Sequence, residues 1–375
     1  MSSKSTNKSD KSRKIESTNP IIEGLKRLAL PLFSVFLSMF IAVFFVMWAK
    51  HYSITQYFTA VGKLFSVVWA GSFGTPKRAL NSLIYITPLL FTGVANAVAF
   101  KTGLFNIGVA GQFVLGMLAA AIVGIIPGLS PIIHIPLIII AGAIAGGFWG
   151  AIPGYLKAKI GTNEVVNTIM MNYIALYFVN WVILRTVFTV KGEASTAVIQ
   201  KSAQLTRFAT DMSRASFGIF VALACAIFIY WLLWKTSIGY EIRAVGLSPF
   251  AAEYGGINIA KNTVLAMLIS GAIAGIGGAM HVSGTMLRMN DMTSLPSYGF
   301  DGIAVALLAK SNPIGCIASA ILFGALRSSS TTLQINGIPK EIVSLIQGVV
   351  IIFVATDYVY KYIAEKKRKG AIING

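Results

Sequence analysis

The sequence predicts an all-α protein, a polytopic integral membrane bundle of about ten transmembrane helices. Of the 375 residues, 55% are hydrophobic and only 12% are charged, whereas soluble domains carry roughly 25% charged residues. The mean hydropathy is +0.74. The apolar residues form long runs, and a helix needs about 20 such residues to cross a bilayer. The chain is therefore predicted to be embedded in a lipid bilayer.

Ten apolar runs are candidate spans. The runs 298–310 and 313–328 are short, and if they form one re-entrant pair the bundle has eight spans instead. Residues 51–74 mix aromatic and polar side chains, which predicts an amphipathic helix on the outer membrane surface. The candidate spans are residues 28–49, 80–100, 104–126, 134–153, 164–187, 216–234, 263–285, 298–310, 313–328 and 340–360.

Basic residues are concentrated at both ends of the chain. Seven Lys and Arg residues precede residue 28, and five follow residue 360. Positive charge flanks membrane segments on the cytoplasmic side, so both termini are predicted to be cytoplasmic. The expected organisation is a disordered basic tail at 1–27, a transmembrane domain at 28–360 and a basic tail at 361–375.

Several function classes are disfavoured by composition. The net charge of +18 does not indicate nucleic-acid binding, because no folded basic domain accompanies it. The three histidines show no ligand spacing, so no metal site is expected. Cys225 and Cys316 lie in apolar runs and are expected to pack as small hydrophobic residues.

Glycines four residues apart mark two of the candidate spans. Small residues at this spacing lie on one helix face and let helix backbones approach closely in lipid. Close packing within a tight bundle is the expected role. The residues concerned are Gly142, Gly146 and Gly150 in one span, and Gly271 and Gly275 in another.

The stretch KTGLFNIGVAGQFVLG (101–116) places polar side chains and glycines inside an apolar region. Asn106 and Gln112 would cost free energy if they faced lipid unpaired. The glycines weaken the helix around them. A broken helix that lines a cavity is one interpretation. The alternative is that these amides form hydrogen bonds between helices.

Residues 161–181, GTNEVVNTIMMNYIALYFVNW, add further amides. Asn163 and Glu164 stand where a helix begins, and a capping role is expected of both. Asn172 lies deeper in the span. It is expected to hydrogen-bond either a ligand or a neighbouring helix.

A loop at 237–262 carries its own short helix signal. Ser248 and Pro249 are favourable at a helix start, and Gly255-Gly256 is favourable at a helix end. A short helix on the cytoplasmic face predicts a docking site for a soluble partner. The sequence contains no phosphate-binding loop of the form GxxxxGK[ST], so any ATP must be bound by another chain.

Carboxylates that could couple transport to ions are scarce. Asp301 is the clearest candidate within a span, and a single carboxylate is a weak basis for ion coupling. No arrangement of nucleophile and base on facing spans is apparent. The chain is therefore expected to be a transport protein and not an enzyme.

Six segments resemble one family, the permease subunits of bacterial ABC importers of the ribose, simple-sugar and branched-chain amino-acid type, and especially its nucleoside branch. The resemblance covers about residues 80–355. Two positions depart from the family pattern: Ala110 replaces the usual Glu, and Ser248 replaces a common Asn. The segments are GLFNIGVAGQ (103–112), GTNEVVNTIMMNYIA (161–175), GYEIRAVGLSPFAAEYGGI (239–257), SGAIAGIGGA (270–279), GFDGIAVALLAKSNPIG (299–315) and FGALRSSS (323–330).

The resemblance implies a type II-like importer permease that moves nucleosides across the bacterial cell membrane by alternating access. It implies a second permease subunit, a cytoplasmic ATPase that binds ATP and Mg²⁺, and an extracellular substrate-binding lipoprotein. No cofactor is expected on this chain. The expected substrate pathway includes Asn106, Gln112, Asn172, Phe300 and Asp301. The expected ATPase-coupling residues are Glu241, Arg243, Ala244, Gly246, Pro249, Ala252, Tyr254 and Gly255.

Two alternatives remain at this point. The first is an ABC permease for simple sugars or another small polar solute. The second is an ion-coupled secondary transporter that works alone. The loop at 237–262 discriminates between the classes, because an autonomous transporter does not need a dock for an ATPase.

Overall fold

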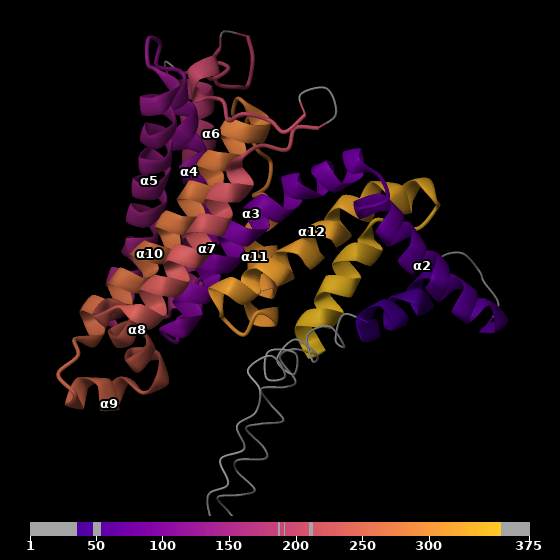
Figure 1. The fold of residues 1–375 in the computed structure, drawn as a ribbon. Coiled ribbons are helices and arrows are strands. Elements are labelled where there is room, and N and C mark those ends of the chain that lie inside the picture. The colour runs from indigo at the N-terminus through magenta and orange to yellow at the C-terminus, as the bar shows by residue number, and fades with distance from the viewer. Residues whose placement is uncertain (1–35, 48–53, 187, 191, 210–212, 354–375) are drawn as a thin grey trace, which may run out of the picture.

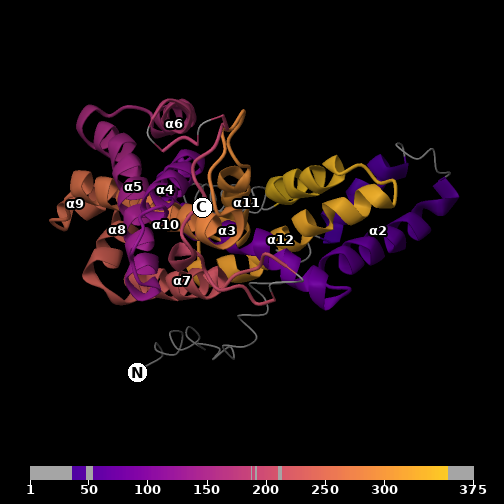
Figure 2. The same cartoon turned by 90° about the horizontal axis from the view of Figure 1, so that it is seen from above.

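The computed structural model describes residues 36–47, 54–186, 188–190, 192–209 and 213–353. Long helices run side by side in one bundle, and a smaller group that contains α2 and α12 leans away from it (Figures 1 and 2). The all-α class is confirmed. Six helices are long and apolar enough to cross a membrane, and four shorter apolar helices accompany them in the described part.

The helices occupy all ten of the predicted runs. The first and last are Phe36–Met47 and Glu341–Phe353. Between them lie η1 (Ile54–Gln56), α2 (Tyr57–Ser72), α3 (Pro76–Lys101), α4 (Val109–Gly124), α5 (Pro131–Ile160), α6 (Glu164–Arg185), η2 (Lys201–Ala203), α7 (Gly218–Lys235), α8 (Ser237–Leu247), α9 (Pro249–Tyr254), α10 (Ile259–His281), the π-helical turn η3 (Val282–Met286), α11 (Tyr298–Leu308) and α12 (Pro313–Ile335).

Helix starts follow local chemistry. Proline occupies the first turn of α3, α5, α9 and α12, where its missing N–H costs nothing. The side chains of Thr75, Asn163, Asn258 and Asn312 accept hydrogen bonds from the first turns of α3, α6, α10 and α12. These caps satisfy backbone donors that have no partner within the helix.

The centre of the bundle is α10, which packs on α5, α4 and α3. A Cβ atom built on Gly142 would lie 2.7 Å from the carbonyl oxygen of Gly275, and one on Gly150 would lie 2.5 Å from that of Met267. Gly146 and Gly271 likewise meet backbone to backbone. The five glycines therefore stand at the contact between α5 and α10, where no larger residue fits.

Three boundaries differ from the sequence-based expectation. α12 continues to Ile335 and is long enough to span, so of the two runs expected to be short, 298–310 and 313–328, only the first holds a short helix, α11 with 11 residues. α4 begins at Val109 instead of 104, because the preceding residues are unwound. α8 forms an additional helix in front of the expected short one.

The aromatic segment before α3 is packed against the protein. α2 lies along α12, and a Cβ on Gly71 would be 3.0 Å from the Cα of Ser329. Ser72 Oγ donates to Ala325 O at 2.7 Å, and Ser82 Oγ donates to Ser72 O at 2.9 Å. The predicted tails 1–27 and 361–375 lie outside the described residues.

Candidate functional site

The polar stretch 101–116 contains a break between two helices. α3 ends at Lys101, and Gly103 adopts a φ of +76°, a conformation that glycine reaches without steric cost. Leu104 N donates to Ala99 O at 3.0 Å and closes the end of α3. The chain then runs unwound to Gly108 before α4 begins. Asn106 lies in this unwound segment.

Asn106 is the centre of a hydrogen-bond network. Its Nδ2 donates to Ser270 Oγ at 2.9 Å and to Gln112 Oε1 at 3.1 Å. Its Oδ1 accepts from Gly108 N at 3.0 Å. Ser270 Oγ in turn donates to Ala95 O at 2.7 Å. The network thus joins the unwound segment to α4, α10 and α3.

Asn172 ties α6 to the same segment. Its Oδ1 accepts from Gly111 N at 2.7 Å, and its Nδ2 donates to Ile107 O at 2.9 Å. Asn106, Gln112 and Asn172 are at most 2% exposed. Their polar atoms face one another in this conformation, which is the geometry of hydrogen bonds between helices. Their expected pathway role stays a prediction.

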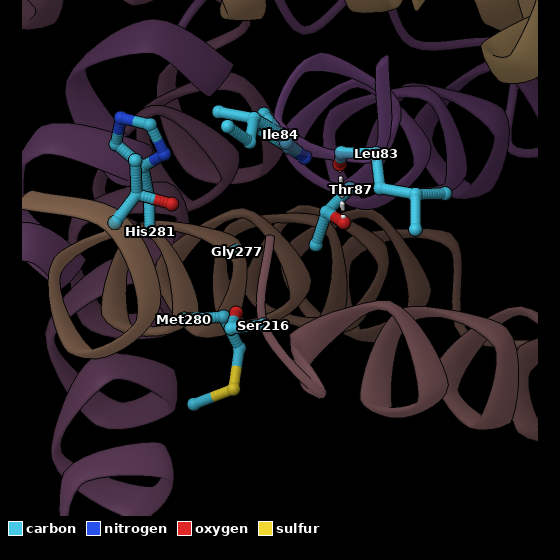
Figure 3. A pocket seen from close by; sticks show the side chains of 9 residues that line it. Leu83, Ile84, Thr87, Ser216, Gly277, Met280 and His281 are labelled. Carbon is cyan, nitrogen blue, oxygen red and sulfur yellow. Dashed lines mark hydrogen bonds between the residues drawn. The ribbon is translucent and has the colours of Figure 1, made fainter. Parts of the chain in front are cut away.

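A narrow pocket lies between α3 and α10, and Figure 3 shows its lining. Its volume is about 10 Å³, close to the minimum that holds one water molecule. Any larger solute therefore requires the helices to separate. The lining residues are Leu83, Ile84, Thr87, Pro88, Ser216, Gly277, Met280, His281 and Thr285.

Both helices are irregular beside this pocket. Pro88 stands inside α3 and removes one backbone donor. Thr87 Oγ1 donates back to Leu83 O at 2.8 Å (Figure 3). α10 passes into the π-helical turn η3, which ends at Leu287 with a φ of +63°. Such π-helical turns and proline positions are frequent where helices bend or bind ligands.

Three aromatic rings adjoin the pocket. His281 lies 5.8 Å from Phe113 and 5.4 Å from Tyr298 between ring centroids, and Phe113 lies 5.9 Å from Tyr298. Such separations suit edge and offset contacts between aromatic groups. The cluster connects α4, α10 and α11, and its member His281 lines the pocket together with Thr87 and Ser216. Sequence reasoning missed this site, although Pro88 within an apolar run was a usable signal.

Among the described residues, Asp301 and Phe300 share no hydrogen bond with the Asn106 network. Asp301 forms an ion pair with Arg327 of α12 at 3.6 Å. Arg327 Nη2 also donates to Ser297 Oγ at 2.7 Å. Phe300 is 49% exposed. The carboxylate therefore has a fixed counter-charge from a neighbouring helix.

α8 and α9 form one end of the molecule, as Figure 1 shows. Thr236 Oγ1 accepts from Gly239 N at 3.1 Å, and Ser248 Oγ accepts from Ala251 N at 3.4 Å. α9 ends at Gly255, and Gly256 adopts a φ of +78°. Beside α9 lies an open groove of about 590 Å³ that includes Lys157, Glu253 and Asn258.

The expected coupling residues divide into two groups. The inner group holds α8 and α9 to the bundle. Glu241 accepts from Asn262 Nδ2 at 2.9 Å, and Arg243 Nε donates to Leu233 O at 2.8 Å. Gly246 packs on the carbonyl group of Lys101 at the end of α3. Ala252 is buried and Ala244 is half-buried.

The outer group faces away from the bundle. Pro249, Tyr254 and Gly255 are exposed, and Tyr254 is 100% exposed. Leu247 and Phe250 are also exposed, at 87% and 84%, although sequence reasoning did not single them out. Three large apolar side chains therefore project from this end.

The opposite end is covered by the loop that follows α6. Thr196 N donates to Met289 O at 2.8 Å, and Leu205 N donates to Ser283 O at 2.9 Å. Glu193 forms an ion pair with Arg288 at 2.8 Å. Because Ser283 lies in η3, this loop closes the end of the bundle next to the narrow pocket.

Comparison with known proteins places these features in a family. Residues 78–355 match the family described as branched-chain amino acid transport system, permease component. The guanosine ABC transporter permease NupP of Bacillus subtilis is 38% identical over 94% of this chain and 100% of its own length. The nucleoside ABC transporter permease NupB of Lactococcus lactis is 33% identical, over 80% and 85%.

A third relative is the glucose ABC transporter permease TsgB13 of Haloferax volcanii, which is 28% identical over 80% of this chain and 81% of its own length. The predicted family and the prediction of a transport subunit in place of an enzyme are confirmed by these matches. The chain belongs to the family of permease components of ABC transport systems of the branched-chain amino acid type.

Proposed function

We propose that this chain is a permease subunit of an ATP-driven importer for nucleosides. The observation that carries the proposal is the irregular pocket between α3 and α10, whose lining residue His281 packs against the rings of Phe113 and Tyr298. Hydroxyl groups beside aromatic rings suit a solute that combines a sugar with a planar base. The names and identities of the guanosine and nucleoside permeases described above support this substrate class.

The pathway in this proposal runs along the pocket and past the Asn106 network. The pocket is too small for a nucleoside in this conformation, so substrate passage requires α3 and α10 to move apart. Pro88 in α3 and the π-helical turn η3 supply the weak points in the two helices. Asn106, Gln112 and Asn172 hold the adjoining unwound segment.

Coupling to ATP runs through the α8–α9 end. Leu247, Phe250 and Tyr254 form the proposed contact with a cytoplasmic ATPase, which binds ATP and Mg²⁺ itself. Movement of α8 reaches α3 directly, because Gly246 touches the Lys101 carbonyl without an intervening side chain. α3 also lines the pocket with Thr87 and Pro88. The part of α3 between Pro88 and Lys101 thus connects the docking end to the pathway.

The proposed partners follow from this arrangement. In Bacillus subtilis, two guanosine permease proteins, NupP and NupQ, are 38% and 27% identical to this chain. By analogy we infer a second permease subunit here. An extracellular substrate-binding lipoprotein would dock at the end covered by residues 192–209. In this orientation the α9 end and both termini are cytoplasmic.

A sugar importer is the second candidate, because one relative is named as a glucose permease. The hydroxyl groups of Thr87 and Ser216 suit a sugar as well as a nucleoside. The aromatic cluster favours the nucleoside, since a planar base can stack on its rings. An ion-coupled carrier receives less support, because the carboxylate of Asp301 is paired with Arg327.

The deciding experiment measures uptake of labelled guanosine, uridine and ribose. Cells with and without this gene are compared after the proton gradient is collapsed with ATP preserved, and after ATP is depleted. We expect gene-dependent nucleoside uptake that survives gradient collapse and stops without ATP.

Uptake that stops with the gradient alone would contradict an ATP-driven importer. Gene-dependent uptake of ribose, with none of either nucleoside, would support the sugar permease instead. The control in every arm is the same strain with a Phe250→Ser and Tyr254→Ser variant, which keeps the pocket and removes the proposed ATPase contact.

A further inference from the structure

Helix α6 has two faces of different character. Its inner face packs mainly on α4 and α5 and contains the buried residues Asn172, Ala175 and Val179. Its outer face, here called the α6 face, consists of Met170, Tyr173, Ile174, Tyr177, Phe178, Trp181 and Leu184, which are 44–71% exposed. Their spacing places them along one stripe of the helix. Figure 2 shows α6 end-on at the margin of the bundle.

The α6 face has the wrong chemistry for lipid. Tyr173 and Tyr177 are the tenth and fourteenth of the 22 residues of α6, so they lie about 14 and 20 Å along a helix of about 33 Å. That is the middle of the span, whereas tyrosine normally lies at the membrane–water interfaces. Among the described residues, neither hydroxyl has a hydrogen-bond partner. A hydroxyl without a partner is unfavourable in hydrocarbon.

The neighbouring helix α5 provides an internal comparison. Its exposed residues are aliphatic or phenyl side chains at the same depth, namely Ile140, Ile144 and Phe148, with 54%, 65% and 67% exposure. Such side chains carry no hydrogen-bonding group that would be left without a partner in lipid. Two adjacent helices of one bundle therefore present different surfaces, one suited to lipid and one that requires polar partners.

We propose that the α6 face is the contact surface for the second permease subunit, whose polar groups accept or donate hydrogen bonds to Tyr173 and Tyr177. This inference rests on the heterodimeric importer proposed above. Tyrosine, tryptophan and methionine are the residues enriched in the cores of protein interfaces. Because the two subunits are related chains, a pseudo-two-fold axis would place the equivalent helix of the second permease against α6.

The position of α6 gives this contact a consequence for transport. Asn172 and Tyr173 are consecutive residues about 100° apart around the helix axis, and Asn172 is buried whereas Tyr173 is exposed. Asn172 binds the backbone of the unwound segment at Ile107 and Gly111. A shift of the second permease across the α6 face would therefore move the segment that holds Asn106. A movement at the proposed interface would thus be transmitted through α6 to the unwound segment before α4.

The test is photo-crosslinking in membranes that contain this chain, the second permease, the ATPase and the lipoprotein. The photoreactive residue p-benzoylphenylalanine replaces Tyr177, and in a matched control it replaces Ile144 on α5. Adducts are identified by mass spectrometry. We expect the Tyr177 probe to capture a peptide from the equivalent helix of the second permease, and the Ile144 probe to capture lipid alone.

Lipid alone at position 177, or capture of a second copy of this chain, the ATPase or the lipoprotein, would overturn the proposal. If those results occur while the second permease and ATPase still co-purify, the proposed importer stands and only the α6 face is wrong. If no second permease co-purifies with the unaltered chain, the heterodimer itself is refuted.

A second measurement isolates the hydroxyl groups. The double variant Tyr173→Phe and Tyr177→Phe keeps the rings and removes both hydroxyls. We expect the amount of second permease that co-purifies to fall about five- to tenfold, in line with hydrogen bonds between membrane helices. The control Ile140→Ala and Ile144→Ala should leave it unchanged. An unchanged yield for the tyrosine variant would contradict the proposed hydrogen bonds.

Discussion

Gly275 of α10 lies in direct backbone contact with Gly142 of α5, and the Gly142 carbonyl oxygen occupies the space that a side chain on residue 275 would need. Gly275 also meets Gly116 of α4 on another side. Three helices thus converge at one position that has no side chain. In lipid, such close approach is a main source of helix association, because the surrounding hydrocarbon offers no hydrophobic driving force.

The first prediction concerns this convergence. Gly275→Ala should destabilise the protein by about 1–3 kcal/mol, since the added methyl group meets backbone atoms that cannot move away independently. Thermal unfolding of the purified protein in detergent measures the loss. Gly62→Ala is the matched control, because a Cβ there would have no neighbour within 4 Å. It should be neutral or slightly stabilising, since alanine is the better helix former. Equal effects of the two variants would show that contact at Gly275 is unimportant.

The second prediction separates the two interpretations of the Asn106 network. Asn106→Ala removes the amide that pairs with polar groups of Gln112, Ser270 and Gly108. Because these buried groups then lack a partner, the free energy of unfolding should fall by about 1–3 kcal/mol. Unfolding temperature and uptake are measured together. Asn336→Ala, at an exposed helix end with a hydrogen bond to Thr332 O, should change stability by less than about 0.5 kcal/mol. A raised KM for nucleoside uptake at unchanged stability would instead favour a direct substrate contact.

The third prediction concerns the docking end. Phe250→Ser and Tyr254→Ser should each reduce ATPase co-purification and ATP-dependent uptake at least several-fold, as expected when a large side chain is removed from an interface. The unfolding temperature should not change, because both side chains are exposed in the isolated chain. Ala251→Ser, on the same helix, is the control. Normal ATPase binding by both variants would exclude this end as the dock.

The fourth prediction concerns the pocket. Thr87→Val removes a lining hydroxyl with little change in volume and should raise the KM for nucleoside uptake several-fold, the size expected for one lost hydrogen bond. Thr186→Val is the control, because Thr186 Oγ1 also donates to the carbonyl four residues before it, that of Val182, but Thr186 follows the last residue of α6 and does not line the pocket. Competition by unlabelled ribose tests the alternative substrate. Equal KM changes in both variants would point to a general effect of the substitution on helix geometry.

Local patterns in the sequence were sufficient for the elements themselves. Each of the ten apolar runs contains a helix, and the glycines of 103–111 predicted the break before α4. Ser248, Pro249 and Gly255 predicted the limits of α9 almost residue by residue. These features depend on neighbours within a few positions, through hydrophobicity, capping and backbone freedom.

What the polar side chains contact was decided by tertiary structure. Asn106 pairs with Ser270, 164 residues away, and the pocket brings together Thr87, Ser216 and His281 from separate segments. The exposure of Leu247 and Phe250 likewise follows from how α8 and α9 project from the bundle. The sequence by itself determined a membrane bundle with a break before α4 and a short helix at Pro249–Tyr254. Only the packing of α10 against α3, α4 and α5 decided which amides are paired and where the narrow pocket lies, because hydrogen bonds and cavities depend on residues that are distant in the chain.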